Sequence, residues 1–110
     1  NMVRDCGAKK VFFASASPPV RFQNVYGIDM PATKELIAHN KSVGQIKRYI
    51  GADELIYQDL ADLKRAAQIG NPDIEEFEDS VFSGNYCTGD VTQSFLKNLE
   101  ASRDDSRRLQ

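Results

Sequence analysis

The stretch "AKKVFFASAS", residues 8–17, decides the fold class of this chain of 110 residues. Its centre, Val11 to Ala14, is continuously apolar rather than alternating, which is typical of a strand covered on both faces in a parallel sheet. The run is too short for a buried helix, and Pro18 and Pro19 end regular structure soon after it. We therefore expect a buried parallel strand over residues 11–14.

The residues before this strand resemble the end of a helix. Val3 and Cys6 share helical spacing, and Gly7 suits the left-handed position that follows a helix. An isolated helix this short is not stable, so we expect the element to begin upstream. Asn1, which precedes Met2, is interpreted as a residue left by cloning, and the chain as a piece of a larger protein.

Two helices are expected after the strand. In "TKELIAHN", residues 33–40, Thr33 is the expected N-cap, and Leu36 and Ile37 are expected to face inward. In "SVGQIKRYIG", residues 42–51, Ser42 and Gln45 form a capping box, which predicts a helix that Gly51 closes.

A second strand and two more helices follow. "DELIYQD", residues 53–59, reads as a strand, and a helix is expected from Asp59, with Leu60, Leu63 and Ala67 inward. Residues 73–89 are expected to be acidic and then extended, with Val81 and Phe82 as anchors. From Asp90, the expected N-cap, a long amphipathic helix continues to the end.

This order of elements indicates an α/β fold. Two strands do not make a self-sufficient parallel sheet, because parallel sheets are covered on both faces. The chain is therefore expected either to add its segment around Val81 to the sheet or to pair with a second copy of itself.

The composition is that of an ordinary soluble globular protein, with 41% hydrophobic residues, 27% charged residues and a net charge of −2. This balance gives no indication of a nucleic-acid or membrane partner, and no apolar run approaches the roughly 20 residues that cross a bilayer. Cys6 and Cys87 lie far apart and read as free thiols, which favours a cytoplasmic protein.

The candidate chemical residues have simple structural interpretations. His39 is expected to be a cation at a helix C-terminus, and Arg21 to be a surface arginine rather than a ligand for an anion. Cys87 has no neighbour that would activate it as a nucleophile. An acidic run is expected to be a solvated face rather than a magnesium site; it consists of Glu75, Glu76, Glu78 and Asp79. The charged residues near the C-terminus are expected to form ion pairs on the helix surface; they are Arg103, Asp104, Asp105, Arg107 and Arg108.

Residues 7–42, "GAKKVFFASASPPVRFQNVYGIDMPATKELIAHNKS", resemble the C-terminal part of the amidophosphoribosyltransferase family. The resemblance continues through "IGADELIYQDLADL", "NPDIEEFEDSVFSGNY" and "TGDV" into the last helix. It implies that residues 3–110 are the C-terminal part of a type I phosphoribosyltransferase domain, with a partial parallel sheet, flanking helices and a long C-terminal helix.

The same resemblance implies an enzyme that makes 5-phosphoribosylamine from phosphoribosylpyrophosphate and glutamine, in the first committed step of purine biosynthesis. The glutaminase domain, the upstream half of the transferase domain and the ligands of Mg²⁺ would lie outside this chain. We therefore expect no catalytic residue here and no activity from the chain alone. Met30 and Pro31 are the expected contacts of a purine nucleotide, whereas Tyr26 and Asp29 are expected to fix the turn.

Some members of that family hold an iron–sulfur cluster through cysteines, and this chain departs from their pattern. It has Asn24, Glu78 and Val81 at the matching positions, and cluster ligation needs thiolates, so none is expected. The resemblance implies a homo-oligomer. The alternative hypothesis is a free-standing α/β interaction module that binds a partner through its C-terminal helix.

Overall fold

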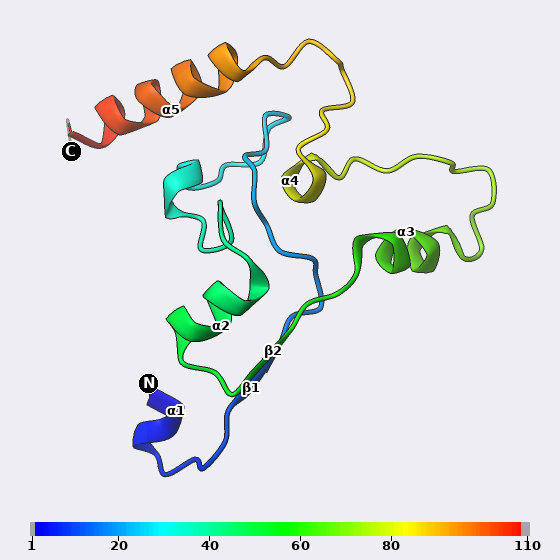
Figure 1. The fold of residues 1–110 in the computed structure, drawn as a ribbon. Coiled ribbons are helices and arrows are strands. Elements are labelled where there is room, and N and C mark those ends of the chain that lie inside the picture. The colour runs from blue at the N-terminus through cyan, green and yellow to red at the C-terminus, as the bar shows by residue number, and fades with distance from the viewer. Residues whose placement is uncertain (1, 109–110) are drawn as a thin grey trace.

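Two short strands pair in parallel in the computed structural model, which describes residues 2–108, and their side chains as far as Ser102. Strand β1 (Phe12–Ala14) lies beside β2 (Glu54–Ile56), with Phe13 opposite Leu55 (Figure 1). Helix α1 (Met2–Asp5) precedes β1, and Gly7 follows it with a φ of 92°. The expected α/β class and the expected helix end at Gly7 are confirmed.

One face of this sheet carries the small core. The connection from β1 to β2 contains the 3-10 helix η1 (Thr33–Glu35) and helix α2 (Val43–Ile50). Ile46 of α2 is 1% exposed and Leu55 of β2 is 7% exposed, and both pack with Ala38. Helix α2 therefore covers the face of the sheet that Leu55 occupies.

The opposite face of the sheet is bare. Side chains alternate along a strand, so Phe12 and Ala14 share this face with Glu54 and Ile56. Phe12 is 63% exposed and Ile56 is 58% exposed. The prediction that the first strand is covered on both faces is wrong for this chain, because α2 covers the other side alone.

The predicted extended segment around Val81 is also wrong, because Val81 lies in a helical turn, α4 (Ser80–Ser83). The Ser83 hydroxyl donates to the Asp79 carboxylate at 2.7 Å, and Gly84 ends the turn with a left-handed φ of 79°. The Val81 carbonyl accepts from the backbone N–H of Arg21 at 2.9 Å. Val81 therefore anchors a loop and adds no strand to the sheet.

The strongest local signals are confirmed. Gln45 N–H donates to the Ser42 hydroxyl and the Gln45 side chain accepts from Ser42 N–H, completing the capping box of α2. Gly51 closes that helix in the left-handed conformation. Asp59 caps α3 (Leu60–Gln68) through two backbone N–H groups, although Ala67 is exposed.

Two expected N-caps are displaced. Ala32 rather than Thr33 precedes η1, and Ile37 is exposed rather than inward. Helix α5 (Gln93–Arg108) begins after Thr92, whose hydroxyl accepts from Phe95 N–H at 3.1 Å, so Asp90 is not its cap. The ion pairs expected at the C-terminus lie outside the described side chains.

The chain is open in shape. Its radius of gyration is 17.1 Å, whereas a compact domain of this length has about 13 Å. Figure 1 shows α5 at the far end of the molecule from α1 and the sheet. Among residues 2–108, none of the helices combines the length and the apolar character that a membrane span needs.

Candidate functional site

The loop between Asn24 and Pro31 is organised by one buried carboxamide. Asn24 is buried, and its side-chain oxygen accepts from the backbone N–H groups of Tyr26 at 2.9 Å and Ile28 at 3.1 Å. Gly27 lies between them with a φ of 104°. Tyr26 and Asp29 were expected to fix the turn, and this role of Asn24 was not predicted. The sequence does contain a signal for this role, because an Asn at the start of a turn often accepts a hydrogen bond from the backbone N–H two residues later.

Two tyrosines attach this loop to the segment before α5. The Tyr26 hydroxyl lies 3.0 Å from the Thr88 hydroxyl, and the Tyr86 hydroxyl donates to the Gln23 carbonyl at 2.8 Å. The two rings meet edge to face with centroids 6.3 Å apart. Burial, assisted by the Glu78 charge, raises the pKa of Tyr86 above its ordinary value. Tyr86 is therefore a neutral hydrogen-bond donor in this packing.

Met30 and Pro31, the expected nucleotide contacts, leave this loop just before η1. Met30 is half-buried, Pro31 is exposed, and the next residue, Ala32, is buried. Beside the loop lies an open groove of about 270 Å³, formed by residues 24, 25 and 27–29 against Phe95 and Leu99 of α5. Met30 and Pro31 follow the turn held by Asn24 in sequence, but they are not among the residues that line this groove, so their assignment as nucleotide contacts stays a prediction.

Arg21 is a structural residue. Its guanidinium Nη1 donates to the carbonyls of Ala38 at 2.7 Å and Lys41 at 2.6 Å, so it closes the turn that follows η1. Of the two interpretations of Arg21, neither a solvated surface arginine nor an anion ligand describes these contacts. The guanidinium is half-buried and bound to backbone.

His39 lies in the turn after η1 rather than at a helix end, and both of its ring nitrogens have hydrogen-bond partners. Its Nδ1 lies 3.0 Å from the Arg21 carbonyl and its Nε2 lies 2.9 Å from the Asn40 amide nitrogen. These partners assign Nδ1 as the donor and Nε2 as the acceptor. Asn40 supports the turn with a φ of 53°.

The acidic run is divided between structure and solvent. Asp79 forms an ion pair with Lys64 and accepts from Ser83, and these contacts, the Lys64 one first, hold the pKa of Asp79 below its ordinary value. Glu78 accepts from Ser80 N–H at 2.9 Å, whereas Glu75 and Glu76 are exposed. Within the described residues, no three His, Cys, Asp or Glu side chains are grouped so as to hold a metal ion.

A second ion pair attaches α1 to the sheet. Asp53 accepts from Val11 N–H and from the Arg4 guanidinium, both at 2.7 Å. These two contacts, the backbone bond first, lower the pKa of Asp53. Cys6 and Cys87 are free and exposed, as expected from their spacing.

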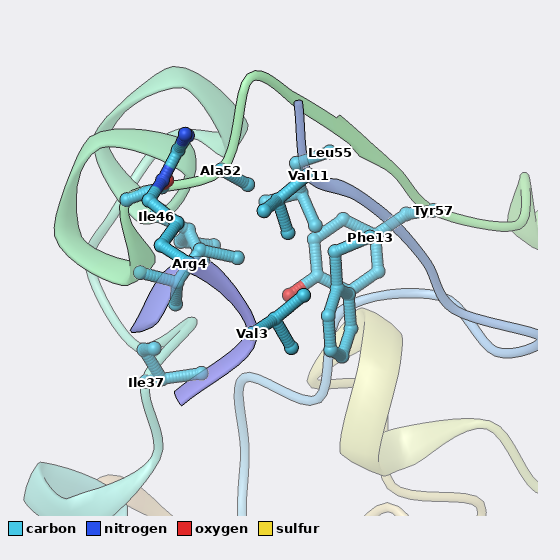
Figure 2. A pocket seen from close by; sticks show the side chains of 11 residues that line it. Val3, Arg4, Val11, Phe13, Ile37, Ile46, Ala52, Leu55 and Tyr57 are labelled. Carbon is cyan, nitrogen blue, oxygen red and sulfur yellow. The ribbon is translucent and has the colours of Figure 1, made fainter. Parts of the chain in front are cut away.

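An apolar opening lies against the core side of the sheet. It is about 300 Å³, and Figure 2 shows side chains from α1, the turn after η1, α2 and both strands around it. Val3, Phe13 and Tyr57 converge on one side of it and Ile37 and Ile46 line the other. The charged residue of its lining is Arg4, whose guanidinium is already engaged with Asp53 and the Gly51 carbonyl. An opening with this lining fits apolar side chains rather than a reacting substrate.

Comparisons with known proteins agree on one family name. The chain is 57% identical over 104 residues to the amidophosphoribosyltransferase of Escherichia coli, and the match covers 94% of this chain and 21% of that protein. It is 51% identical over 105 residues to the enzyme of that name from Pseudomonas aeruginosa, covering 96% of the chain and 21% of the relative.

The same name recurs in yeast. The Saccharomyces cerevisiae amidophosphoribosyltransferase is 43% identical over 104 residues, which are 94% of this chain and 20% of the relative. No family model matches the chain. The chain is therefore homologous to amidophosphoribosyltransferases over nearly its whole length, and it spans about one fifth of the length of the relatives it matches.

Proposed function

We propose that residues 3–110 are the C-terminal part of the phosphoribosyltransferase domain of an amidophosphoribosyltransferase. The parent would be a cytoplasmic, magnesium-dependent glutamine amidotransferase that makes 5-phosphoribosylamine from phosphoribosylpyrophosphate and glutamine for purine biosynthesis. The observation that carries this proposal is the match to the Escherichia coli amidophosphoribosyltransferase, which covers 94% of this chain but only 21% of that protein.

The large exposed surface of the chain supports the proposal that other parts of the parent protein cover it. The accessible area is 8146 Å², whereas a folded monomer of this mass exposes about 6,100 Å². The excess of about 2,000 Å² equals a large protein interface. Phe12 and Ile56 on the bare sheet face are part of it. In the parent, the remaining transferase half would cover this face, and further copies would complete a homo-oligomer.

The catalytic groups of the parent would lie outside this chain. The glutaminase cysteine, the loop that binds phosphoribosylpyrophosphate and the ligands of Mg²⁺ are all proposed to lie upstream, so no reaction step is assigned to residues here. Met30 and Pro31 are proposed to contact a purine nucleotide. Asn24 would then act as a positioning residue, because its carboxamide holds the turn that precedes them.

We also propose that this chain holds no iron–sulfur cluster. Asn24 stands where cluster-containing relatives would have a cysteine, and its side-chain oxygen is committed to two backbone N–H groups. Val81 and Glu78 stand at the other two positions, and neither side chain supplies a thiolate.

A chimera tests the assignment. The chain would replace the matching segment of the Escherichia coli enzyme, and glutamine-dependent release of pyrophosphate from phosphoribosylpyrophosphate would be measured. We expect the chimera to be active and the chain alone, given Mg²⁺ and ammonia, to release no pyrophosphate above background. A chimera that folds and assembles but is inactive would contradict the assignment. Turnover by the chain alone would contradict the upstream location of the catalytic groups.

A matched pair of variants tests the covered face within the chimera. Phe12→Asp places a charge on the sheet face that the parent is proposed to bury, and Tyr49→Asp places the same charge on an exposed residue of α2. We expect the Phe12→Asp chimera to lose its solubility and activity, and the Tyr49→Asp chimera to keep both. Equal behaviour of the two variants would show that this face stays open in the parent.

A further inference from the structure

The carboxamide of Gln23 is buried without partners. Gln23 is 2% exposed, and neither its Oε1 nor its Nε2 has a hydrogen-bond partner within the described part of the chain. Its backbone is fixed, because Tyr86 donates to its carbonyl. A buried polar group left unpaired is costly, so such groups normally meet a water or a ligand.

Gln23 is one of the residues that line a pocket of about 260 Å³ between residues 22–23 and one face of α5. The apolar and aromatic part of the pocket lining comes from Phe22, Tyr86 and Leu96, and Lys97 of α5 also lines it. A small number of polar groups in an apolar wall is the usual arrangement of a small-molecule site, where those groups orient the ligand.

His39 and Glu100, two other polar residues of the pocket, already have partners. Both ring nitrogens of His39 are hydrogen-bonded, and a Glu100 carboxylate oxygen accepts from Thr33 N–H at 2.6 Å. The Gln23 carboxamide remains with a donor and an acceptor side by side. Both polar atoms are covered in this structure, so binding would require this carboxamide to reorient toward the pocket, and the terminal torsion of a Gln side chain is soft.

We propose that this pocket binds a small molecule through an amide edge, meaning a carboxamide or lactam that presents one N–H donor beside one C=O acceptor. Such an edge pairs with both free atoms of Gln23, and its ring or chain packs against Phe22 and Leu96. The inference rests on the pocket and its carboxamide and is independent of the proposed enzyme.

The probes are 2-pyridone, a flat lactam, and N-methyl-2-pyridone, which keeps the ring and carbonyl but lacks the N–H. Each is titrated into the ¹⁵N-labelled chain and followed by NMR chemical shifts. We expect 2-pyridone to bind with a Kd on the order of 1 mM and to shift the signals of Phe22, Gln23 and Leu96. The methylated probe should bind about tenfold more weakly, because one hydrogen bond is lost.

Two variants complete the test. Gln23→Leu should lower the affinity for 2-pyridone to that of the methylated probe, whereas Gln93→Leu, at an exposed Gln of the same pocket, should leave it unchanged. If Gln23→Leu does not fold, as judged by its NMR spectrum, Gln23→Met takes its place. The proposal is overturned if both probes bind the native chain equally, if neither shifts these signals, or if the Gln23 variants still prefer 2-pyridone.

Discussion

Replacing Gly84 with Ala should destabilise the chain through two separable effects. Gly84 has a φ of +79°, and a Cβ built on it would lie 3.0 Å from Cζ of Phe22. A left-handed Ala costs about 1–2 kcal/mol, part of which is offset by lower unfolded-state entropy, leaving about 1 kcal/mol. The contact involves the outer end of a ring, which can yield slightly, so it adds about 1 kcal/mol.

Gly89→Ala is the matched control. Gly89 has a similar φ of +73°, but nothing lies within 4 Å of the Cβ that this substitution would add. We therefore expect a loss of about 2 kcal/mol for Gly84→Ala and about 1 kcal/mol for Gly89→Ala. With an m-value of about 2 kcal/mol/M, the urea midpoints would fall by about 1 M and about 0.5 M.

Urea unfolding followed by circular dichroism measures both losses. A second background, Phe22→Leu, removes the ring atoms that the new Cβ would meet, so the extra cost at Gly84 should disappear there. Equal losses for Gly84→Ala and Gly89→Ala in the native background would refute the reasoning. The same conclusion would follow if the extra loss at Gly84 persisted in the Phe22→Leu background, where the side chain is shorter.

Three further perturbations test other contacts. Asn24→Ala removes the acceptor of two loop N–H groups and should lower the free energy of unfolding by about 2 kcal/mol. Asn24→Asp keeps an acceptor and should lower it less. Equal losses for the two variants would contradict the role of this side chain. The Lys64 and Ser83 contacts lower the pKa of folded Asp79, so they stabilise the fold above the unfolded pKa of about 3.9 and are lost as pH falls below it. Unfolding measured at neutral and acidic pH should therefore show a smaller acid-induced loss for Asp79→Asn, and an unchanged loss would count against the ion pair. Asp59→Ala removes the cap of α3 and should cost about 1 kcal/mol in the same urea assay, most of which Asp59→Ser should restore.

Local signals predicted helix ends well because a cap needs only its neighbours. The Ser42 and Gln45 capping box and the left-handed Gly51 are complete within one short stretch of chain, and both occur as expected. Thr92 took the place of Asp90 as a cap because both residue types serve at that position and the hydroxyl of Thr92 reaches Phe95 N–H.

Burial was predicted less well because it depends on residues elsewhere. The apolar run containing Phe12 indicated a strand, which is confirmed, but its partners determine whether a face is covered. Val81 lies in a helical turn because Asp79 and Ser83 bond across it, and apolar periodicity does not report such contacts. In the loop, the role of Asn24 depends on backbone N–H groups whose direction follows from the turn itself.

The parallel pairing of β1 with β2 has a consequence for synthesis of the protein. The hydrogen bond between Val11 and Asp53 joins residues 42 positions apart. A ribosome adding roughly 5–20 residues per second would need about 2–8 s to supply the second strand after the first has emerged. During that interval β2 cannot pair with β1, so Phe12 and Phe13 spend seconds of synthesis without this partner strand.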